Sequence, residues 1–236
     1  MSVFVFILAR SSMLYHEIYT LSPQSPWMIF IHGAGGSRLT WKYQVQGFKP
    51  FFNLLLLDLR DHGNSKEICP EYRQYNLDIL TDDIIFLMDH LRIKDAYLMS
   101  LSLGSIFVQH IAGKRPDLVK GTVMAGAVCK ANARMKLLAF LARAVYPILP
   151  FKTTYHLFAF VIMPRKNHRN SRRIFRSQAR KLSPGDFNKW MSLLGEFLGS
   201  LEQTFHEKLI QPSLIVMGAQ DHVFYSAALQ YARNQS

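Results

Sequence analysis

The stretch "MSLSLGS", residues 99–105, places a serine between two leucines where one apolar pattern gives way to another. Ala96–Ser100 is an apolar run typical of a buried strand, and Ser105–Lys114 has the pattern of a helix. A tight strand-to-helix turn requires small residues, and Gly104 follows Ser102 by two positions. Such a turn would present the Ser102 hydroxyl as a nucleophile, although the same letters also fit an ordinary polar turn.

Similar apolar runs alternate with helical patterns along the whole chain. Leu77–Leu91 carries apolar residues at three- and four-residue spacing behind a candidate N-cap, Asn76, and Ser226–Arg233 is another predicted helix. This alternation predicts an α/β fold, with a mostly parallel sheet and helices on both faces. The remaining predicted strands are Val3–Leu8, Leu14–Thr20, Trp27–Ile31, Phe52–Leu57, Gly121–Val128 and Ser213–Met217.

Residues 130–208 interrupt the alternation, because they contain several helical patterns and no clear strand. We interpret this segment as a helical cap over the ends of the strands. The predicted organisation is therefore one domain with an insertion. Residues 1–129 form the N-terminal part of the core, 130–208 the cap, and 209–236 the C-terminal part of the core.

A second chemical motif, "HGAGGS" at residues 32–37, follows the predicted strand Trp27–Ile31. Its flexible backbone could offer the amide of Ala34, together with that of Leu103, to a developing oxyanion. A phosphate-binding glycine loop is disfavoured, because neither G-x-G-x-x-G nor a Walker lysine is present.

Four segments, in this order, resemble the α/β-hydrolase superfamily. "HGAGGS" followed by Trp41 resembles the family's oxyanion segment. "LLLLDLRDHGNS", residues 54–65, resembles a strand signature in which Asp61 stands where a glycine is usual. "LMSLSLGS" resembles the nucleophile elbow, and "PSLIVMGAQDHVF", residues 212–224, resembles the turn that carries the catalytic acid. The resemblance extends from about residue 12 to residue 235.

The resemblance implies that Ser102 is the nucleophile and Asp221 the acid of a serine hydrolase. A serine at the elbow implies attack on an ester, thioester, lactone or carbon–carbon substrate, and argues against the carboxylate attack of dehalogenases and epoxide hydrolases. We therefore predict hydrolysis of a small, apolar carboxylic ester or related acyl substrate, with no cofactor and no metal. The implied oxyanion-hole residues are Ala34 and Leu103, and the implied structural residues are His32, Gly33, Gly104, Asp58 and His62.

The general base of this family is a histidine that follows the acid, but only His222 follows Asp221 here. An imidazole directly beside the acid cannot bridge it to Ser102. The family's last strand and helix are also missing. We favour a C-terminally truncated sequence; lost catalysis, or substitution by His156, His168 or His206 of the cap, are the alternatives. The printed chain is thus expected to be nearly inactive.

The alternative hypothesis is a non-catalytic binding or membrane-surface protein with the same fold. The distribution of charge along the chain is relevant to this alternative. The chain has 28 Lys and Arg against 16 Asp and Glu, a net charge of +12. Residues 165–181 hold eight of these bases and no acid. They could form an amphipathic helix that contacts an anionic membrane surface or an acidic substrate, or a solvated face, which we favour. Nucleic-acid binding is not expected, since no aromatic side chains interleave the bases as a stacking platform.

Cysteine usage and apolar runs indicate a cytoplasmic protein. The two cysteines, Cys69 and Cys129, form neither a disulfide framework nor a metal spacing. The short apolar run Val3–Ala9 fits a strand better than a signal peptide. No stretch has the 18 uncharged apolar residues of a membrane span. Residues 137–163, rich in Leu, Phe and Ala, would line a substrate pocket or pack the core of the cap.

Overall fold

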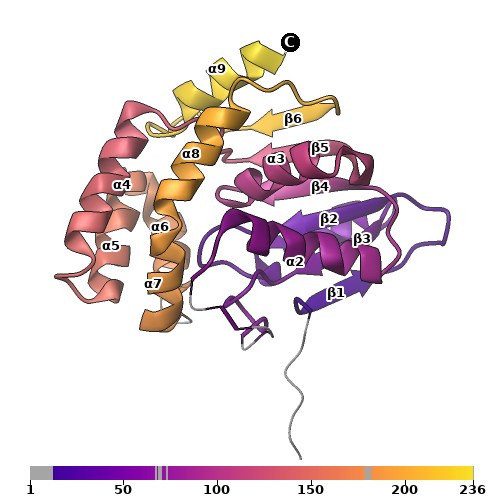
Figure 1. The fold of residues 1–236 in the computed structure, drawn as a ribbon, viewed down its shortest axis with the longest axis horizontal. Helices are drawn as coiled ribbons and strands as arrows, with labels where there is room; N and C mark the ends of the chain where they lie inside the picture. Colours follow the sequence, from indigo (N-terminus) through magenta and orange to yellow (C-terminus); the bar gives the residue numbers. More distant parts are fainter. Residues whose placement is uncertain (1–12, 67, 69–70, 73, 179–181, 236) are drawn as a thin grey trace, which may run out of the picture.

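The computed structural model describes residues 13–66, 68, 71–72, 74–178 and 182–235 (Figure 1). Six strands form one sheet in the order β1-β3-β2-β4-β5-β6. β1 is antiparallel to β3, and the other neighbours are parallel, so the predicted mostly parallel sheet is confirmed. The strands are β1 (His16–Tyr19), β2 (Trp27–Ile31), β3 (Asn53–Leu57), β4 (Ala96–Leu101), β5 (Val119–Ala125) and β6 (Ser213–Val216).

β2 is apolar along its whole length, and β3 is apolar from Leu54 onward, because both faces of each strand are covered. Ile29 and Leu55 pack into the main core beneath α2 (Leu77–His90) and α3 (Gly104–Lys114). Their neighbours Phe30 and Leu54 point to the opposite face. There they pack with Trp41 of the 3-10 helix Arg38–Trp41 and with the short α1 (Val45–Phe48).

The predicted helices are confirmed within two residues of their expected ends. The Asn76 side chain accepts a hydrogen bond from the Ile79 amide at 2.7 Å, which caps α2. The C-terminal helix is α9 (Tyr225–Gln235). A further 3-10 turn, Pro116–Leu118, leads from α3 into β5.

Five α-helices and a 3-10 turn (Lys166–His168) separate β5 from β6, and the described part of residues 130–208 contains no strand. Figure 1 shows the first four beside the sheet, at the left. The fifth, α8, places Phe197 and Leu201 in the main core, whereas Tyr155 and Phe187 form a separate cluster. The domain limits at 130 and 208 stay predictions. The five helices are α4 (Ala133–Val145), α5 (Phe151–Ile162), α6 (Arg169–Gln178), α7 (Pro184–Ser192) and α8 (Leu194–Thr204).

Two predicted strands differ from the structure. β1 is shorter than Leu14–Thr20, and β5 ends at Ala125 instead of Val128. Gly126 has φ +54°, a left-handed conformation that turns the chain out of the sheet. The predicted strand Val3–Leu8 lies outside the described residues. None of the helices described is long and apolar enough to cross a bilayer.

Candidate active site

Ser102 occupies a strained turn between β4 and α3. Its φ is +50°, in the left-handed region that residues with a side chain rarely adopt. The Ser102 amide donates to the Ala125 carbonyl of β5 at 2.9 Å. Ser102 is half-buried, and its hydroxyl has no hydrogen-bond partner among the described residues. The turn therefore leaves this hydroxyl available for a ligand.

Two glycines permit the serine turn and the end of β2 to approach each other closely. A Cβ added to Gly104 would lie 2.7 Å from the Ile31 carbonyl oxygen, closer than real Cβ contacts. A Cβ added to Gly33 would lie 3.0 Å from the Leu101 carbonyl oxygen and 3.2 Å from the Ser102 Cβ. The loop after β2 therefore lies directly against the serine turn.

The amide of Leu103 is one candidate oxyanion donor. It shares a peptide unit with the Ser102 carbonyl, which accepts from the Ser105 amide at 2.9 Å and from the Ser105 hydroxyl at 2.7 Å. In a trans peptide the N–H points away from the C=O. The described residues supply no acceptor for the Leu103 N–H.

The amide of Ala34 is arranged in the same way. Its peptide unit carries the Gly33 carbonyl, which accepts from the His32 Nδ1 at 2.8 Å and from the Gly36 amide at 3.0 Å. The Ala34 N–H has no acceptor in the part of the chain that the structure describes. Both candidate donors thus belong to peptide units whose carbonyls are each held by two hydrogen bonds.

His32 is occupied at both ring nitrogens. Nε2 accepts from the Leu59 amide at 3.0 Å, so the proton lies on Nδ1 and is donated to Gly33. Burial, together with the nearby His62, lowers the pKa of His32 to about 3. This imidazole is therefore neutral at pH 7 and is committed to the loop.

His62 likewise supports the loop after β2. Its Nε2 accepts from the Gly35 amide at 3.0 Å, and its Nδ1 donates to the Arg60 carbonyl at 2.8 Å. Burial lowers the pKa of His62. Its ring packs edge-on against Trp190 of α7, with centroids 4.7 Å apart.

Asp58 follows β3 and ties together three segments. Its carboxylate accepts from the Arg38 amide at 2.6 Å and from the Arg38 guanidinium at 2.9 Å. It also accepts from the Asn64 amide at 2.8 Å. Because the carboxylate is fully buried, it depends on these charge-assisted hydrogen bonds.

Asp61 stands where the family that the sequence resembles usually has glycine, and its φ is +62°. The backbone thus keeps the conformation that favours glycine, while the side chain forms new contacts. Its carboxylate accepts from the Tyr75 hydroxyl at 2.9 Å and from the Trp190 indole at 3.1 Å. Asp61 therefore connects the loop after β3 to α7.

A second contact from the inserted helices reaches the loop after β2. The Tyr155 hydroxyl of α5 lies 3.4 Å from the Ala34 carbonyl oxygen. Tyr155 is buried and stacks on Phe175, with centroids 4.4 Å apart. Burial raises the pKa of this phenol well above its usual range. α5 therefore covers the loop that carries the Ala34 amide.

Asp221 lies in the loop after β6. Its Oδ1 accepts from the amides of Val223 and Phe224, at 2.9 and 2.7 Å. In the described part of the chain its carboxylate bonds to no histidine ring. The same loop is held by the inserted helices, since Arg134 donates to the His222 carbonyl at 2.7 Å. The structure therefore places Ser102 against the loop at Gly33, but shows no hydrogen bond between Ser102 and Asp221 among the described residues.

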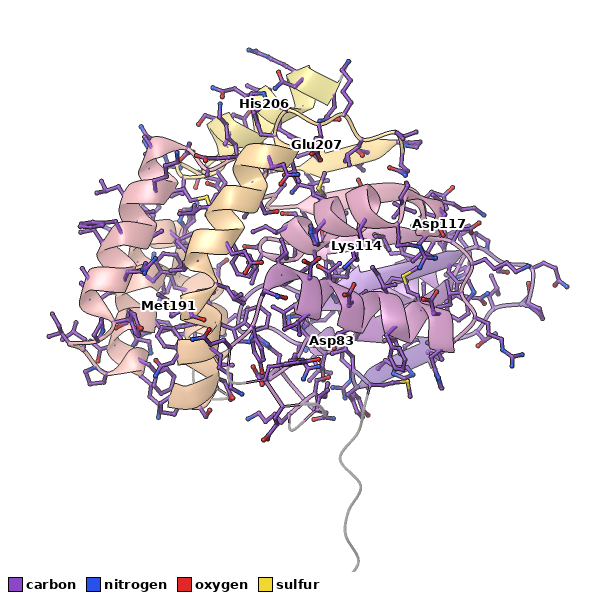
Figure 2. All side chains as sticks on the ribbon, viewed as in Figure 1. Asp83, Lys114, Asp117, Met191, His206 and Glu207 are labelled. Atoms are coloured by element: carbon purple, nitrogen blue, oxygen red, sulfur yellow. The ribbon has the colours of Figure 1, made fainter. Side chains whose placement is uncertain are left out.

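The other histidines considered as a base lie in different surroundings. His222 is exposed. His206 follows α8, at the top of Figure 2, and packs edge-on against Phe205. His156 lies 3.4 Å from an Arg176 nitrogen, and His168 closes the 3-10 turn before α6. None of these rings forms a hydrogen bond to Ser102 within the described residues.

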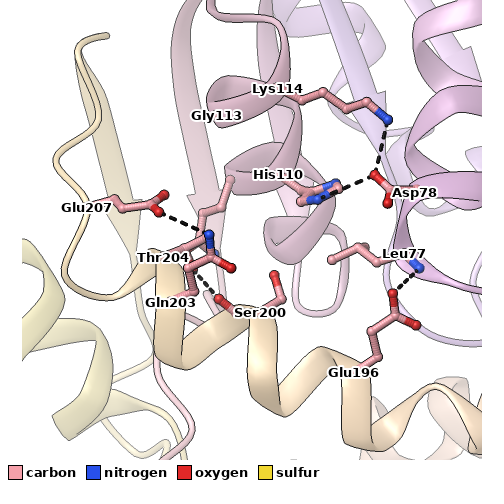
Figure 3. Close-up of a pocket in the computed structure, with 11 residues that line it drawn as sticks. Leu77, Asp78, His110, Gly113, Lys114, Glu196, Ser200, Gln203, Thr204 and Glu207 are labelled. Atoms are coloured by element: carbon pink, nitrogen blue, oxygen red, sulfur yellow. Dashed lines mark hydrogen bonds and ion pairs between the residues drawn. The ribbon is translucent and has the colours of Figure 1, made fainter.

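The larger of the two described cavities is a groove of about 490 Å³ between α2, α3 and α8, away from the serine turn (Figure 3). Its charged side chains already have partners within the protein: Lys114 bonds to Asp78 at 3.0 Å, and the Gln203 amide donates to Glu207 at 3.4 Å. The Glu196 carboxylate accepts from the Leu77 amide at 2.8 Å. We therefore regard it as a groove between packed helices.

Sequence reasoning missed the roles of Ser105, Tyr155 and Trp190. Ser105 was visible as the last letter of the elbow motif, and its hydroxyl also accepts from the Val128 amide at 2.8 Å. Tyr155 and Trp190 had no local signal, since their partners lie more than a hundred positions away. Within residues 137–163, Ala139, Tyr155 and Ala159 are buried, while several other apolar side chains face solvent; that this segment lines a substrate pocket stays a prediction.

Comparison with known proteins identifies the class. A family model described as the alpha/beta hydrolase fold matches residues 26–235. The chain therefore belongs to the alpha/beta hydrolase family, as the motifs indicated.

Individual relatives resemble part of the chain in sequence. The chain is similar to 3-oxoadipate enol-lactonase 2 of Acinetobacter baylyi (30% identical over 105 residues, 44% of this chain and 38% of the relative). It is similar to human epoxide hydrolase 4 (30% identical over 110 residues, 46% and 30%). These matches span well under two thirds of either relative.

Among solved structures, an alpha/beta hydrolase from a Medee basin deep-sea metagenome library superimposes with a TM-score of 0.76. It is 21% identical, and the match covers 94% of this chain and 82% of that one. An esterase from Thermogutta terrifontis gives a TM-score of 0.71 at 19% identity, over 94% and 82% of the two chains. At such identities the likeness concerns the fold alone.

Proposed function

We propose that this protein carries the nucleophile and the oxyanion hole of a serine hydrolase. Ser102 is the nucleophile, and the substrate is a carboxylic ester or lactone. The observation that carries the proposal is the pair of unpaired amides, Ala34 and Leu103, beside a serine at φ +50°. Donors aimed at one place stabilise the tetrahedral oxyanion that forms when a hydroxyl attacks a carbonyl. The alpha/beta hydrolase family and its enol-lactonase and esterase relatives support the same chemistry.

Asp221 is the proposed acid, and Gly33, Gly104, Asp58, His32 and His62 are the proposed supports of the two donor loops. A hydroxyl needs a base to become a strong nucleophile. His32 and His62 cannot serve, because both ring nitrogens of each are engaged. We therefore expect the 236-residue chain to hydrolyse p-nitrophenyl acetate no faster than Ser102→Ala. Losing the base of such a triad costs several orders of magnitude in rate.

The decisive test supplies the base from outside. Added imidazole should increase the labelling of Ser102 by a fluorophosphonate probe and should raise ester turnover above that of Ser102→Ala. The matched control, Ser226→Ala, removes an exposed hydroxyl of α9 and should behave as the wild type. Mass spectrometry locates the adduct. Equal labelling and turnover in the wild type and Ser102→Ala, with imidazole present, would disprove the proposal.

A non-catalytic binding protein on the same scaffold is the second candidate. It is favoured by the Asp221 carboxylate, which bonds to two backbone amides and to no histidine among the described residues. In that case the probe leaves Ser102 unlabelled even with imidazole. Labelling at Ser102 excludes this candidate.

A further inference from the structure

Three of the inserted helices, α4, α5 and α6, lie in a long stretch of sequence without negative charge. Between Asp117 and Asp186 the sequence contains no Asp or Glu, yet it holds half of the 28 Lys and Arg residues. The net charge of this stretch therefore exceeds the +12 of the whole chain. Such a field attracts an anionic partner and repels a second copy of the same surface.

The same helices expose large apolar side chains in stripes. On α4, Leu137, Phe140 and Leu141 face solvent, and Phe140 is 68% exposed. Ile148, in the turn between α4 and α5, is 79% exposed. Their three- and four-residue spacing places the α4 residues on one side of that helix. A face of this kind is unusual on a surface that contacts only water.

Helices α5 and α6 adjoin α4, because α4 contacts α5 and α5 contacts α6, and they too expose apolar and basic side chains. Phe160 of α5 is half-exposed, and the Arg172 guanidinium lies over its ring at 4.9 Å. Ile174 of α6 is 60% exposed and stands beside the exposed Arg173. Ile174 thus lies among the bases. Apolar and basic groups are therefore mixed on one surface.

We propose that the outer surface of α4, α5 and α6 docks onto an anionic lipid bilayer. Exposed Phe, Leu and Ile side chains enter the boundary between headgroups and acyl chains, while Arg and Lys side chains contact the anionic headgroups. A nucleic acid would match the charge, but it would leave Phe140 and Ile148 in water. The mixture of groups thus favours a lipid surface.

The contribution of charge is tested by measuring, through co-sedimentation, how strongly the protein binds phosphatidylcholine vesicles with and without phosphatidylserine. The triple variant Lys166→Gln, Arg169→Gln, Arg173→Gln removes three exposed bases of this surface. We expect it to bind the anionic vesicles about a hundredfold more weakly, as each base near such a surface contributes roughly a factor of five. The control Lys49→Gln, Lys94→Gln, Lys208→Gln removes the same charge elsewhere and should bind as the wild type.

The apolar contribution is tested with Phe140→Ser and Ile148→Ser, against Phe51→Ser, an equally exposed phenylalanine outside the inserted helices. The first two should weaken vesicle binding at least tenfold, because burying such a side chain is favourable. Ser102→Ala should bind vesicles as the wild type, so that this test is independent of the hydrolase proposal. Equal binding to both vesicle types, or equal loss in the matched controls, would overturn the inference. A third result would also overturn the inference: the wild type binds an oligonucleotide but not the vesicles, and Phe140→Ser binds the oligonucleotide as well as the wild type does.

Discussion

Ser102 and its neighbours show how single residues create the candidate site. The serine adopts a conformation that costs free energy. Gly33 leaves room for the Ser102 side chain, and Gly104 leaves room for the Ile31 carbonyl at the end of β2. Ser105 fixes the far side of the turn through the Ser102 carbonyl. Each residue acts on the backbone, so the site depends on peptide groups more than on side chains.

Gly104 and Gly113 lie on the same helix and provide a matched pair. Gly104→Ala should lower the free energy of unfolding by about 1–3 kcal/mol, because its Cβ would meet the Ile31 carbonyl oxygen at 2.7 Å. In Gly113→Ala the added Cβ would meet no atom within 4 Å, so this variant should raise the free energy of unfolding by roughly 0.5–1 kcal/mol. Urea denaturation of both variants checks the opposite signs. A loss of stability in both would contradict the steric argument.

The buried His32 makes stability depend on pH. Its pKa is lowered to about 3 in the folded chain, while the unfolded chain binds the proton near pH 6.5. The stability contribution is complete above pH 6.5. It is lost as pH falls from there toward 3, at about 1.4 kcal/mol per pH unit.

His32→Gln should therefore flatten the pH dependence of the unfolding free energy between pH 6.5 and acidic pH, whatever its effect at pH 7.5. His90→Asn, which removes an exposed histidine at the end of α2, is the control and should keep the wild-type slope. Urea titrations across this range give both slopes. An unchanged slope in His32→Gln would show that another group governs acid unfolding.

At the scale of elements, the inserted helices divide into two kinds. α8 is part of the main core, where Leu201 is fully buried and Phe197 packs edge-on against Phe107 of α3. α5, α6 and α7 share a smaller cluster around Tyr155 and Phe187. The smaller cluster buries fewer apolar side chains, so it should open more readily.

Two substitutions that shorten a buried side chain should distinguish the two kinds of helix. Leu201→Ala should cost about 2–5 kcal/mol of global stability, because it leaves a cavity in the main core. Phe187→Ala should mainly reduce amide hydrogen-exchange protection in α5–α7, with little change in β2–β5. Hydrogen exchange with mass spectrometry resolves the two patterns. If Phe187→Ala lowers protection in the sheet as much as Leu201→Ala does, the insertion and the sheet form one cooperative unit.

Local patterns predicted the elements well, and long-range contacts account for what they missed. The apolar runs at Trp27–Ile31 and Ala96–Ser100 specified strands because both faces are covered, and Asn76 specified a cap. The left-handed position at Asp61 was visible only as a departure from a glycine. Its bond to Trp190 depends on the three-dimensional packing of α7, which no local pattern encodes.

At the scale of the whole molecule, the sheet has two edges, formed by β1 and by β6 among the described strands. β1 pairs with β3 at one edge, while β6 is the last described strand at the other. Leu214 and Val216 of β6 are about half-exposed. Unpaired backbone groups and apolar side chains on such an edge favour pairing with another chain.

Leu214→Lys should therefore reduce self-association of the 236-residue chain, since a charge on an edge strand opposes pairing. Phe51→Lys adds the same charge at an exposed apolar residue away from β6 and is the control. Sedimentation velocity over a range of protein concentrations measures the change. If both variants associate as the wild type does, the edge of β6 takes no part in self-association.

The carbonyls of Gly33 and Ser102 each accept two hydrogen bonds, and this affects the charge distribution of their peptide groups. A carbonyl that accepts two hydrogen bonds draws electron density through the amide resonance and leaves its N–H more positive. In the proposed oxyanion hole, the amide dipoles at Ala34 and Leu103 would therefore be oriented and polarised before a ligand arrives, and would need no reorganisation when negative charge develops on it. A tetrahedral anion would meet a ready-made electric field.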